Sequence, residues 1–162
     1  MIQSVNPAPT DETDGLPMPK RIWAVISVGF ALCMSVLDVN IINIVLPTLS
    51  HDFGTSPAVT TWIINGYQLA IVVSLLSFSA LGEIIGYRKV YLSGIGLFCI
   101  TSLICALSDS FWTLTIARIF QGFSASAITS VNTAQLRYIY PKSQLGRGMG
   151  INAMVVAISA AA

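Results

Sequence analysis

Four apolar blocks, each close to the length of a membrane span, dominate this chain. They run over residues 22–46, 60–81, 90–107 and 111–136. A helix needs about 20 predominantly apolar residues to cross the roughly 30 Å hydrocarbon layer of a bilayer. Inside that layer a backbone must satisfy its own hydrogen bonds, which a helix does within one segment. The sequence therefore predicts an all-α membrane protein in which these four ranges are spanning helices.

The charge content agrees with a membrane location. Charged residues make up 9% of the chain and apolar residues 54%, whereas soluble domains average about 25% charged residues. A surface with so few charges belongs in lipid, so membrane lipid is the first partner that we expect. The net charge is +1 and no run of basic residues occurs, which excludes nucleic acid as a partner.

The two ends of the chain differ from its middle. Residues 1–21 are polar and interrupted by prolines, a composition that predicts a disordered cytoplasmic tail. Residues 22–162 form the predicted transmembrane bundle. A fifth apolar block, 146–162, is still running at the last residue. We expect an incomplete fifth helix and an amino-terminal portion of a longer bundle, whose carboxy-terminal helices are needed for a full pathway.

The basic residues predict the orientation of the helices. Seven of the eight Lys and Arg residues lie in the tail or in loops that fall on one side of the membrane: Lys20, Arg21, Arg88, Lys89, Arg137, Lys142 and Arg147. The loops 47–59 and 108–110 on the other side contain none. By the positive-inside rule, we expect a multi-pass protein of the cell (inner) membrane with its amino terminus in the cytoplasm.

Two charged residues interrupt the apolar blocks. Asp38 lies roughly 12 Å below the outer end of the first predicted helix and Arg118 roughly 10 Å below the same face in the fourth. Charge inside a bilayer is costly and marks a candidate functional site. One interpretation is a static ion pair that fixes helix packing. The other is proton coupling, because a carboxylate in such a site can exchange a proton as its surroundings change.

Further polar side chains lie at similar depths and predict a substrate cavity open toward the outer half. They are Asn43, Asn65, Tyr67, Gln68 and Gln121. Hydrogen bonding between helices is the alternative explanation for each of them.

A short turn between the second and third helices contains the residues of a predicted cytoplasmic gate: Glu83, Gly86, Arg88 and Lys89. Its basic residues could instead serve only to set topology.

Nothing in the sequence indicates catalysis or a cofactor. Cys33, Cys99 and Cys105 lie in apolar blocks without metal-ligand spacing, so we expect packing residues rather than a metal site or disulfides. Phosphate-binding glycine loops and nucleophile motifs do not occur. We therefore expect no enzyme activity, no cofactor and no metal.

Three segments resemble signatures of one transporter family. The stretch 37–47 resembles the first-helix signature of the major facilitator superfamily, and 114–127 resembles its fourth-helix motif, with Arg118, Gln121 and Gly122 on the key positions. The stretch 79–89 resembles the family's loop motif between the second and third helices. The resemblance is closest to the fourteen-helix drug:H⁺ antiporter branch.

The match to the family pattern is incomplete. In the loop motif, Ser79 replaces the usual glycine, Glu83 the usual aspartate and Ile84 the usual arginine. In the first-helix signature, Asn40 replaces a frequent threonine. The acidic charge of the loop motif is kept and its arginine is lost.

The resemblance implies a fold and a mechanism. The fold would be a major-facilitator-type helical bundle that works by alternating access around a central site. Arg118 would take part in proton translocation, Asp38 would support the coupling network, and Glu83 with Arg88 would lock the cytoplasmic gate. The implied function is proton-coupled efflux of multiple drugs or other small amphipathic compounds.

Two other functions stay open. One is proton-coupled uptake of a nutrient by symport. The family's antiporter motif in the fifth helix would begin about where this sequence ends, so the sequence does not separate exchange from symport. The other is a truncated fragment that only inserts and packs in the membrane.

Overall fold

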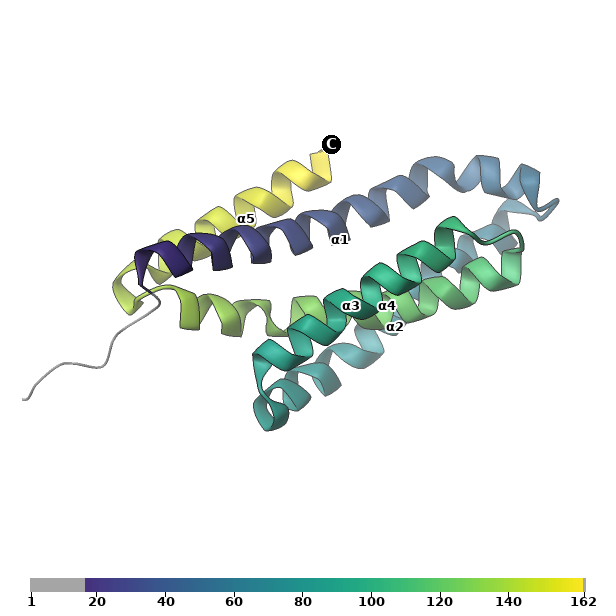
Figure 1. Ribbon diagram of the computed structural model, residues 1–162. Coiled ribbons are helices and arrows are strands. Elements are labelled where there is room, and N and C mark those ends of the chain that lie inside the picture. The colour runs from purple at the N-terminus through teal and green to yellow at the C-terminus, as the bar shows by residue number, and fades with distance from the viewer. Residues whose placement is uncertain (1–16, 162) are drawn as a thin grey trace, which may run out of the picture.

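The computed structural model describes residues 17–161 as five long helices joined by short connections (Figure 1). In chain order the elements are α1 (Met18–Asp52), α2 (Pro57–Ile85), α3 (Tyr87–Ala106), α4 (Phe111–Ile139), a short 3-10 helix η1 (Lys142–Gln144) and α5 (Leu145–Ala161). No strand occurs within the described residues. The predicted all-α fold is confirmed.

The start of α1 corrects the predicted boundary of the disordered tail. The tail was placed at 1–21, but residues 18–21 already form the first turn of α1. The reason is Pro19, which lies at one of the first two helical positions. The N–H groups of the first helical turn have no partner within the helix, so a proline there loses no hydrogen bond. Proline is therefore common at the start of helices. Residues 1–16 of the predicted tail lie outside the described part of the chain.

The other helix ends are set by local capping rather than by hydropathy. Ser56 and Ser110 precede α2 and α4, and each hydroxyl accepts a hydrogen bond from a backbone N–H three residues later. Gly86 alone separates α2 from α3 and has φ of +99°, a conformation that side chains disfavour. Helices α1, α2 and α4 extend beyond the apolar ranges seen in the sequence, and for α2 the cap at Ser56 and the break at Gly86 set both ends.

Three of the described helices, α1 from Pro19 onward, α2 and α3, are long and apolar enough to cross a membrane. Helix α4 has 29 residues but carries more polar side chains on its buried face. Those polar groups are tolerated because α4 packs between α2 and α3 in the interior of the bundle. Apolar side chains cover much of the exposed surface of the bundle, as in a multi-pass membrane protein.

Close backbone contacts hold α4 against its neighbours. A Cβ atom added to Gly122 would lie 2.5 Å from the Tyr67 carbonyl oxygen of α2. A Cβ atom added to Gly94 of α3 would lie 3.1 Å from Cβ of Ala127. Small residues at such positions let helices approach closely in a membrane. Helix α4 is therefore fixed against α2 and α3 by glycines on both sides.

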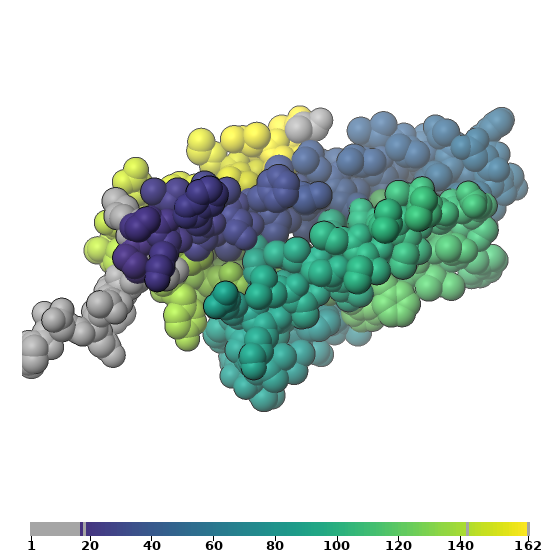
Figure 2. Space-filling model, viewed as in Figure 1, coloured from purple at the N-terminus to yellow at the C-terminus, as the bar shows by residue number. Residues whose placement is uncertain are grey.

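Helix α1 joins the bundle differently. It runs beside α5, and the two lie together along one side of the molecule (Figures 1 and 2). The Asn40 side-chain amide donates to the carbonyl oxygen of Ser159 at 3.2 Å, which links the two helices. Helix α1 also contacts α2 and α4, and its contact with α4 positions the candidate site.

Candidate functional site

Asp38 of α1 and Arg118 of α4 form an ion pair inside the bundle. The Arg118 Nη1 atom lies 2.7 Å from Asp38 Oδ2. The Arg118 side chain is 7% exposed and that of Asp38 is 16% exposed. The pair therefore joins two helices that are distant in sequence, away from bulk solvent.

Gln121 completes the hydrogen bonding of the carboxylate. It lies nearly one turn after Arg118 on α4 and is 0% exposed. Its Nε2 donates to Asp38 Oδ1 at 3.1 Å, so both carboxylate oxygens have a donor. The Gln121 Oε1 atom accepts from Cys105 Sγ of α3 at 3.4 Å. We call the four connected residues, Asp38, Arg118, Gln121 and Cys105, the Asp38 cluster.

Tyr67 of α2 also lies at the cluster. Its buried ring has its centroid 6.0 Å from the Arg118 guanidinium carbon, within the range of a cation–π contact. The Arg118 Nε atom is buried and has no hydrogen-bond partner within residues 17–161. A buried donor without an acceptor is uncommon, so the site has unused capacity to bind one.

This arrangement can act as a proton-sensitive link between helices. A charged Asp38 accepts two hydrogen bonds from α4, and charge-assisted bonds are the stronger kind. A proton added to the carboxylate removes its charge and weakens both bonds. The same carboxylate can thus change its protonation and, with it, the strength of the contact between α1 and α4.

Three residues of the predicted substrate cavity do not join the cluster. Asn43, Asn65 and Gln68 are exposed, and the Asn43 amide donates to Val39 within its own helix. Successive helical residues are about 100° apart, so Asn65 and Gln68 point away from the face on which Tyr67 is buried. Only Tyr67 and Gln121 of the predicted cavity residues lie at the charged pair.

The predicted gate residues lie at the end of the bundle where α2 meets α3. Glu83, Gly86, Arg88 and Lys89 are all exposed there. No ion pair joins Glu83 to Arg88 within the described chain. We call this end, where α1 and α3 begin and α2 and α4 finish, the basic end of the bundle.

Cys105 is the member of the cluster that the sequence analysis missed. The sequence predicts only a packing residue at this position, as at Cys33 and Cys99. Cys99, on the same helix, is exposed, and the two share an apolar sequence context. Only the packing of α3 on α4 distinguishes them, so the sequence contains no signal for this contact.

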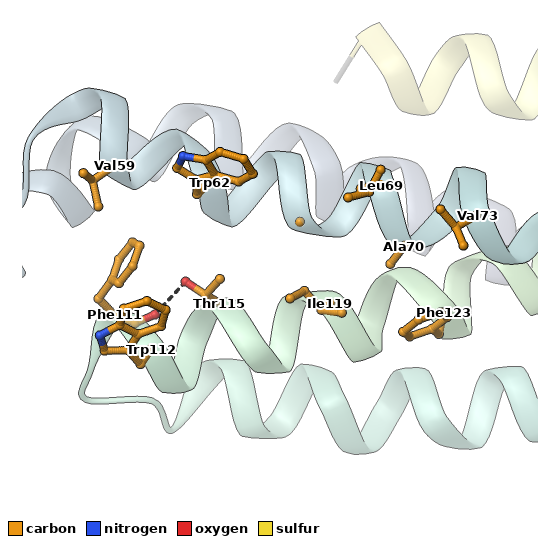
Figure 3. A pocket seen from close by; sticks show the side chains of 11 residues that line it. Val59, Trp62, Leu69, Ala70, Val73, Phe111, Trp112, Thr115, Ile119 and Phe123 are labelled. Atoms are coloured by element: carbon orange, nitrogen blue, oxygen red, sulfur yellow. Dashed lines mark hydrogen bonds between the residues drawn. The ribbon is translucent and has the colours of Figure 1, made fainter.

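A separate apolar groove lies between α2 and α4, with a volume of about 580 Å³ (Figure 3). Trp62 and Leu69 project from α2 and Trp112, Ile119 and Phe123 from α4. The hydroxyl of Thr115 in its wall is used within α4, where it donates to the Phe111 carbonyl oxygen at 2.8 Å. The groove has no charged lining residue, so its surface suits an apolar group rather than an ion.

Known proteins place this chain among transporters. The model of the Major Facilitator Superfamily matches residues 28–162. The uncharacterized transporter YebQ of Escherichia coli is 51% identical over 154 residues, which are 95% of this chain and 34% of that protein.

Two further relatives have more specific names. The riboflavin transporter RibZ of Clostridioides difficile is 32% identical over 86% of this chain and 31% of its own length. The drug efflux pump JefA of Mycobacterium tuberculosis is 31% identical over 89% of this chain and 28% of its own length. The chain thus spans about a third of the curated relatives it matches. It belongs to the Major Facilitator Superfamily.

Proposed function

We propose that this chain is the amino-terminal portion of a proton-coupled secondary transporter that exports small amphipathic compounds by alternating access. The observation that carries the proposal is the buried Asp38–Arg118 pair, with Gln121 on the second carboxylate oxygen. An ionisable group inside a membrane bundle is costly and is typical of ion and proton pathways. The relative named as a drug efflux pump supports export as the direction.

In the proposed cycle, Asp38 is the proton-accepting group and Arg118 is its charged partner. Uptake of a proton neutralises the carboxylate, weakens the bonds from Arg118 and Gln121, and loosens α1 from α4. Loss of the proton on the other side of the membrane restores both bonds. The changes in contact between the two helices bias the bundle toward one of its two open states.

We assign the polar side chains near the pair to the substrate path. Tyr67 and Gln121 lie at the cluster, while Asn43, Asn65 and Gln68 are exposed on long apolar helices. Exposed amides at these positions favour a face covered by water, substrate or other helices over one covered by lipid. The separate apolar groove between α2 and α4 has Gly66 and Ala70 in its wall, and it supplies surface for the apolar part of an amphipathic substrate.

The proposal includes an orientation and a gate. The basic residues at the basic end favour the cytoplasmic side of the inner membrane for that end and for the amino terminus. Glu83, Gly86, Arg88 and Lys89 form the proposed cytoplasmic gate, in which Gly86 provides the sharp break between α2 and α3.

Uptake of a nutrient with protons is the second candidate function. It is favoured by the relative named as a riboflavin transporter. In this case the Asp38 cluster would be used in the same way, but proton and substrate would move in the same direction.

Reconstitution of the full-length protein in proteoliposomes tests the proposal. An imposed pH gradient is expected to drive amphipathic dyes against the direction of proton flow, and a protonophore is expected to stop this flux. Movement of substrate in the same direction as protons would favour uptake instead. Flux that is indifferent to the pH gradient would contradict proton coupling, and empty liposomes are the control.

A further inference from the structure

Helix α1 has polar links to two neighbouring helices within one of its turns. Asp38 accepts hydrogen bonds from two side chains of α4. Two residues later, the side-chain amide of Asn40 donates to α5, to the carbonyl oxygens of Ser159 at 3.2 Å and of Ala160 at 3.4 Å. Successive helical residues are about 100° apart, so Asp38 and Asn40 leave α1 on nearly opposite sides. We propose that Asn40 is a positioning residue that ties α5 to α1, so that protonation of Asp38 releases both helices from α4 together.

The two links respond differently to protons. In the proposed transport cycle, on which this inference rests, the Asp38 carboxylate takes up a proton and its bonds to α4 weaken. A carboxamide and a backbone carbonyl do not change their protonation in the physiological range. The link from Asn40 to α5 is therefore kept when the link from Asp38 to α4 is lost.

Helix α5 takes no part in the pH-dependent contact within the described chain. The charged and titratable groups that face Asp38 come from the other three helices: Arg118 of α4, Tyr67 of α2 and Cys105 of α3. The one charged residue of α5 is Arg147 in its first turn, whereas Asn40 meets the last described turn of that helix. Any response of α5 to the proton on Asp38 therefore has to pass through α1.

Packing between α1 and α5 supports the hydrogen bond. The two helices run side by side (Figure 1). A Cβ atom added to Gly29 of α1 would lie 3.9 Å from Cγ2 of Val155, an ordinary van der Waals distance. Ser159 is buried, and its hydroxyl donates to the Val155 carbonyl oxygen within α5. The Asn40 amide thus adds a directional bond to a contact that is already packed.

A second contact joins the same helices at the basic end of the bundle. The ring of Tyr140, the residue after α4, meets both α1 and α5. Its centroid lies 5.9 Å from the Arg21 guanidinium carbon, and a Cβ atom added to Gly148 would lie 2.5 Å from the ring. Since this contact contains no carboxylate, we expect it to stay closed and to act as the pivot of the movement.

Threonine at position 40, which the first-helix signature often has, would not make the link to α5. Its hydroxyl lies one bond closer to the backbone than the asparagine amide does. Helical threonines of this chain bond within their own helix: Thr101, Thr115 and Thr129 each donate to the carbonyl oxygen four residues earlier, a common habit of this side chain. Asn40→Thr should therefore remove the link and keep a polar side chain at the site.

Distances between spin labels in the full-length protein test the proposal, in a background whose native cysteines are replaced by serine. Labels at Thr48→Cys and Ile158→Cys report α1 against α5, and labels at Thr113→Cys and Ile158→Cys report α4 against α5; all three positions are exposed. From mildly basic to mildly acidic pH, the α4–α5 distance should lengthen by about 2–5 Å, the size of common helix shifts. The α1–α5 distance should stay constant.

Variants then separate the two links. In Asn40→Thr the pattern should reverse at acidic pH, with a longer α1–α5 distance and an unchanged α4–α5 distance. Asp38→Asn should show the acidic-pH distances at both pH values. Asn43→Thr is the matched control, because the Asn43 amide bonds only within α1. Ser159→Ala should also behave like the unmodified protein, since the acceptor on α5 is the backbone carbonyl.

Three results would overturn the inference: an α1–α5 distance that changes with pH in the unmodified protein, an α4–α5 distance that does not, or equal behaviour of Asn40→Thr and Asn43→Thr. Flux measured on the same proteins separates this inference from the proposed function. If a pH gradient still drives flux while α1 and α5 part, the transport proposal stands and the tie at Asn40 is wrong. If neither flux nor either distance responds to pH, both fail.

Discussion

Asp38→Asn is expected to abolish substrate flux driven by a pH gradient in the full-length protein. An asparagine has nearly the same shape and keeps one oxygen that can accept from Arg118 or Gln121, so insertion into the membrane should be unchanged. It cannot take up or release a proton in the physiological range. Flux into or out of proteoliposomes with an imposed pH gradient should therefore fall to the level of empty liposomes.

Asp52→Asn is the matched control for this experiment. Asp52 is the last residue of the same helix and is exposed, so its replacement removes a carboxylate without touching the Asp38 cluster. Flux in this variant should equal that of the unmodified protein. Full pH-driven flux in Asp38→Asn would remove Asp38 from the coupling mechanism and leave the ion pair with a packing role alone.

Gly122→Ala is expected to destabilise the bundle by about 1–3 kcal/mol, the usual cost of overpacking a tight interface. The upper part of this range is expected because the added methyl group meets backbone. A Cβ atom there would lie 2.5 Å from the Tyr67 carbonyl oxygen and 2.9 Å from the Ala70 Cβ. The free energy of unfolding in mixed detergent micelles measures the effect. The variant should also lose flux, since displacement of Tyr67 disturbs the contact of its ring with Arg118.

Gly96→Ala provides the comparison for this prediction. Gly96 is a helical glycine of α3, and a Cβ atom added to it meets nothing within 4 Å. Its replacement by alanine should be neutral or stabilising by up to about 1 kcal/mol, because alanine is the better helix former. If Gly122→Ala proves as stable as Gly96→Ala, α2 and α4 do not make the close approach described above.

The fold class and the charged pair could be anticipated from the sequence because the bilayer restricts the alternatives. Long apolar blocks can satisfy their backbone only as helices, which is what α1 to α4 are. A charge in the hydrocarbon needs a partner, and Asp38 and Arg118 fall at similar depths on antiparallel helices. The structure brings these two residues into contact.

Rotation about each helix axis could not be anticipated in the same way. Depth places Asn65, Tyr67 and Gln68 at one level of α2, but only Tyr67 is buried. The face of α2 that meets α4 is set by the close approach at Gly122, which requires the partner helix to be known. The place of Cys105 in the cluster could not be anticipated for the same reason. Hydropathy does not separate Cys105 from the exposed Cys99 on the same helix.

A double-mutant cycle on Asp38 and Arg118 tests most directly whether the two residues form one buried unit. The free energy of unfolding of the full-length protein is measured for Asp38→Asn, Arg118→Gln and the double variant. Arg118→Gln alone should cost about 3–5 kcal/mol, because it leaves a buried carboxylate without its cation. The double variant should be more stable than the sum of the two single effects predicts, by about 0.5–3 kcal/mol. Single effects that add to within about 0.5 kcal/mol would contradict the account, since they would show that these two charges do not interact.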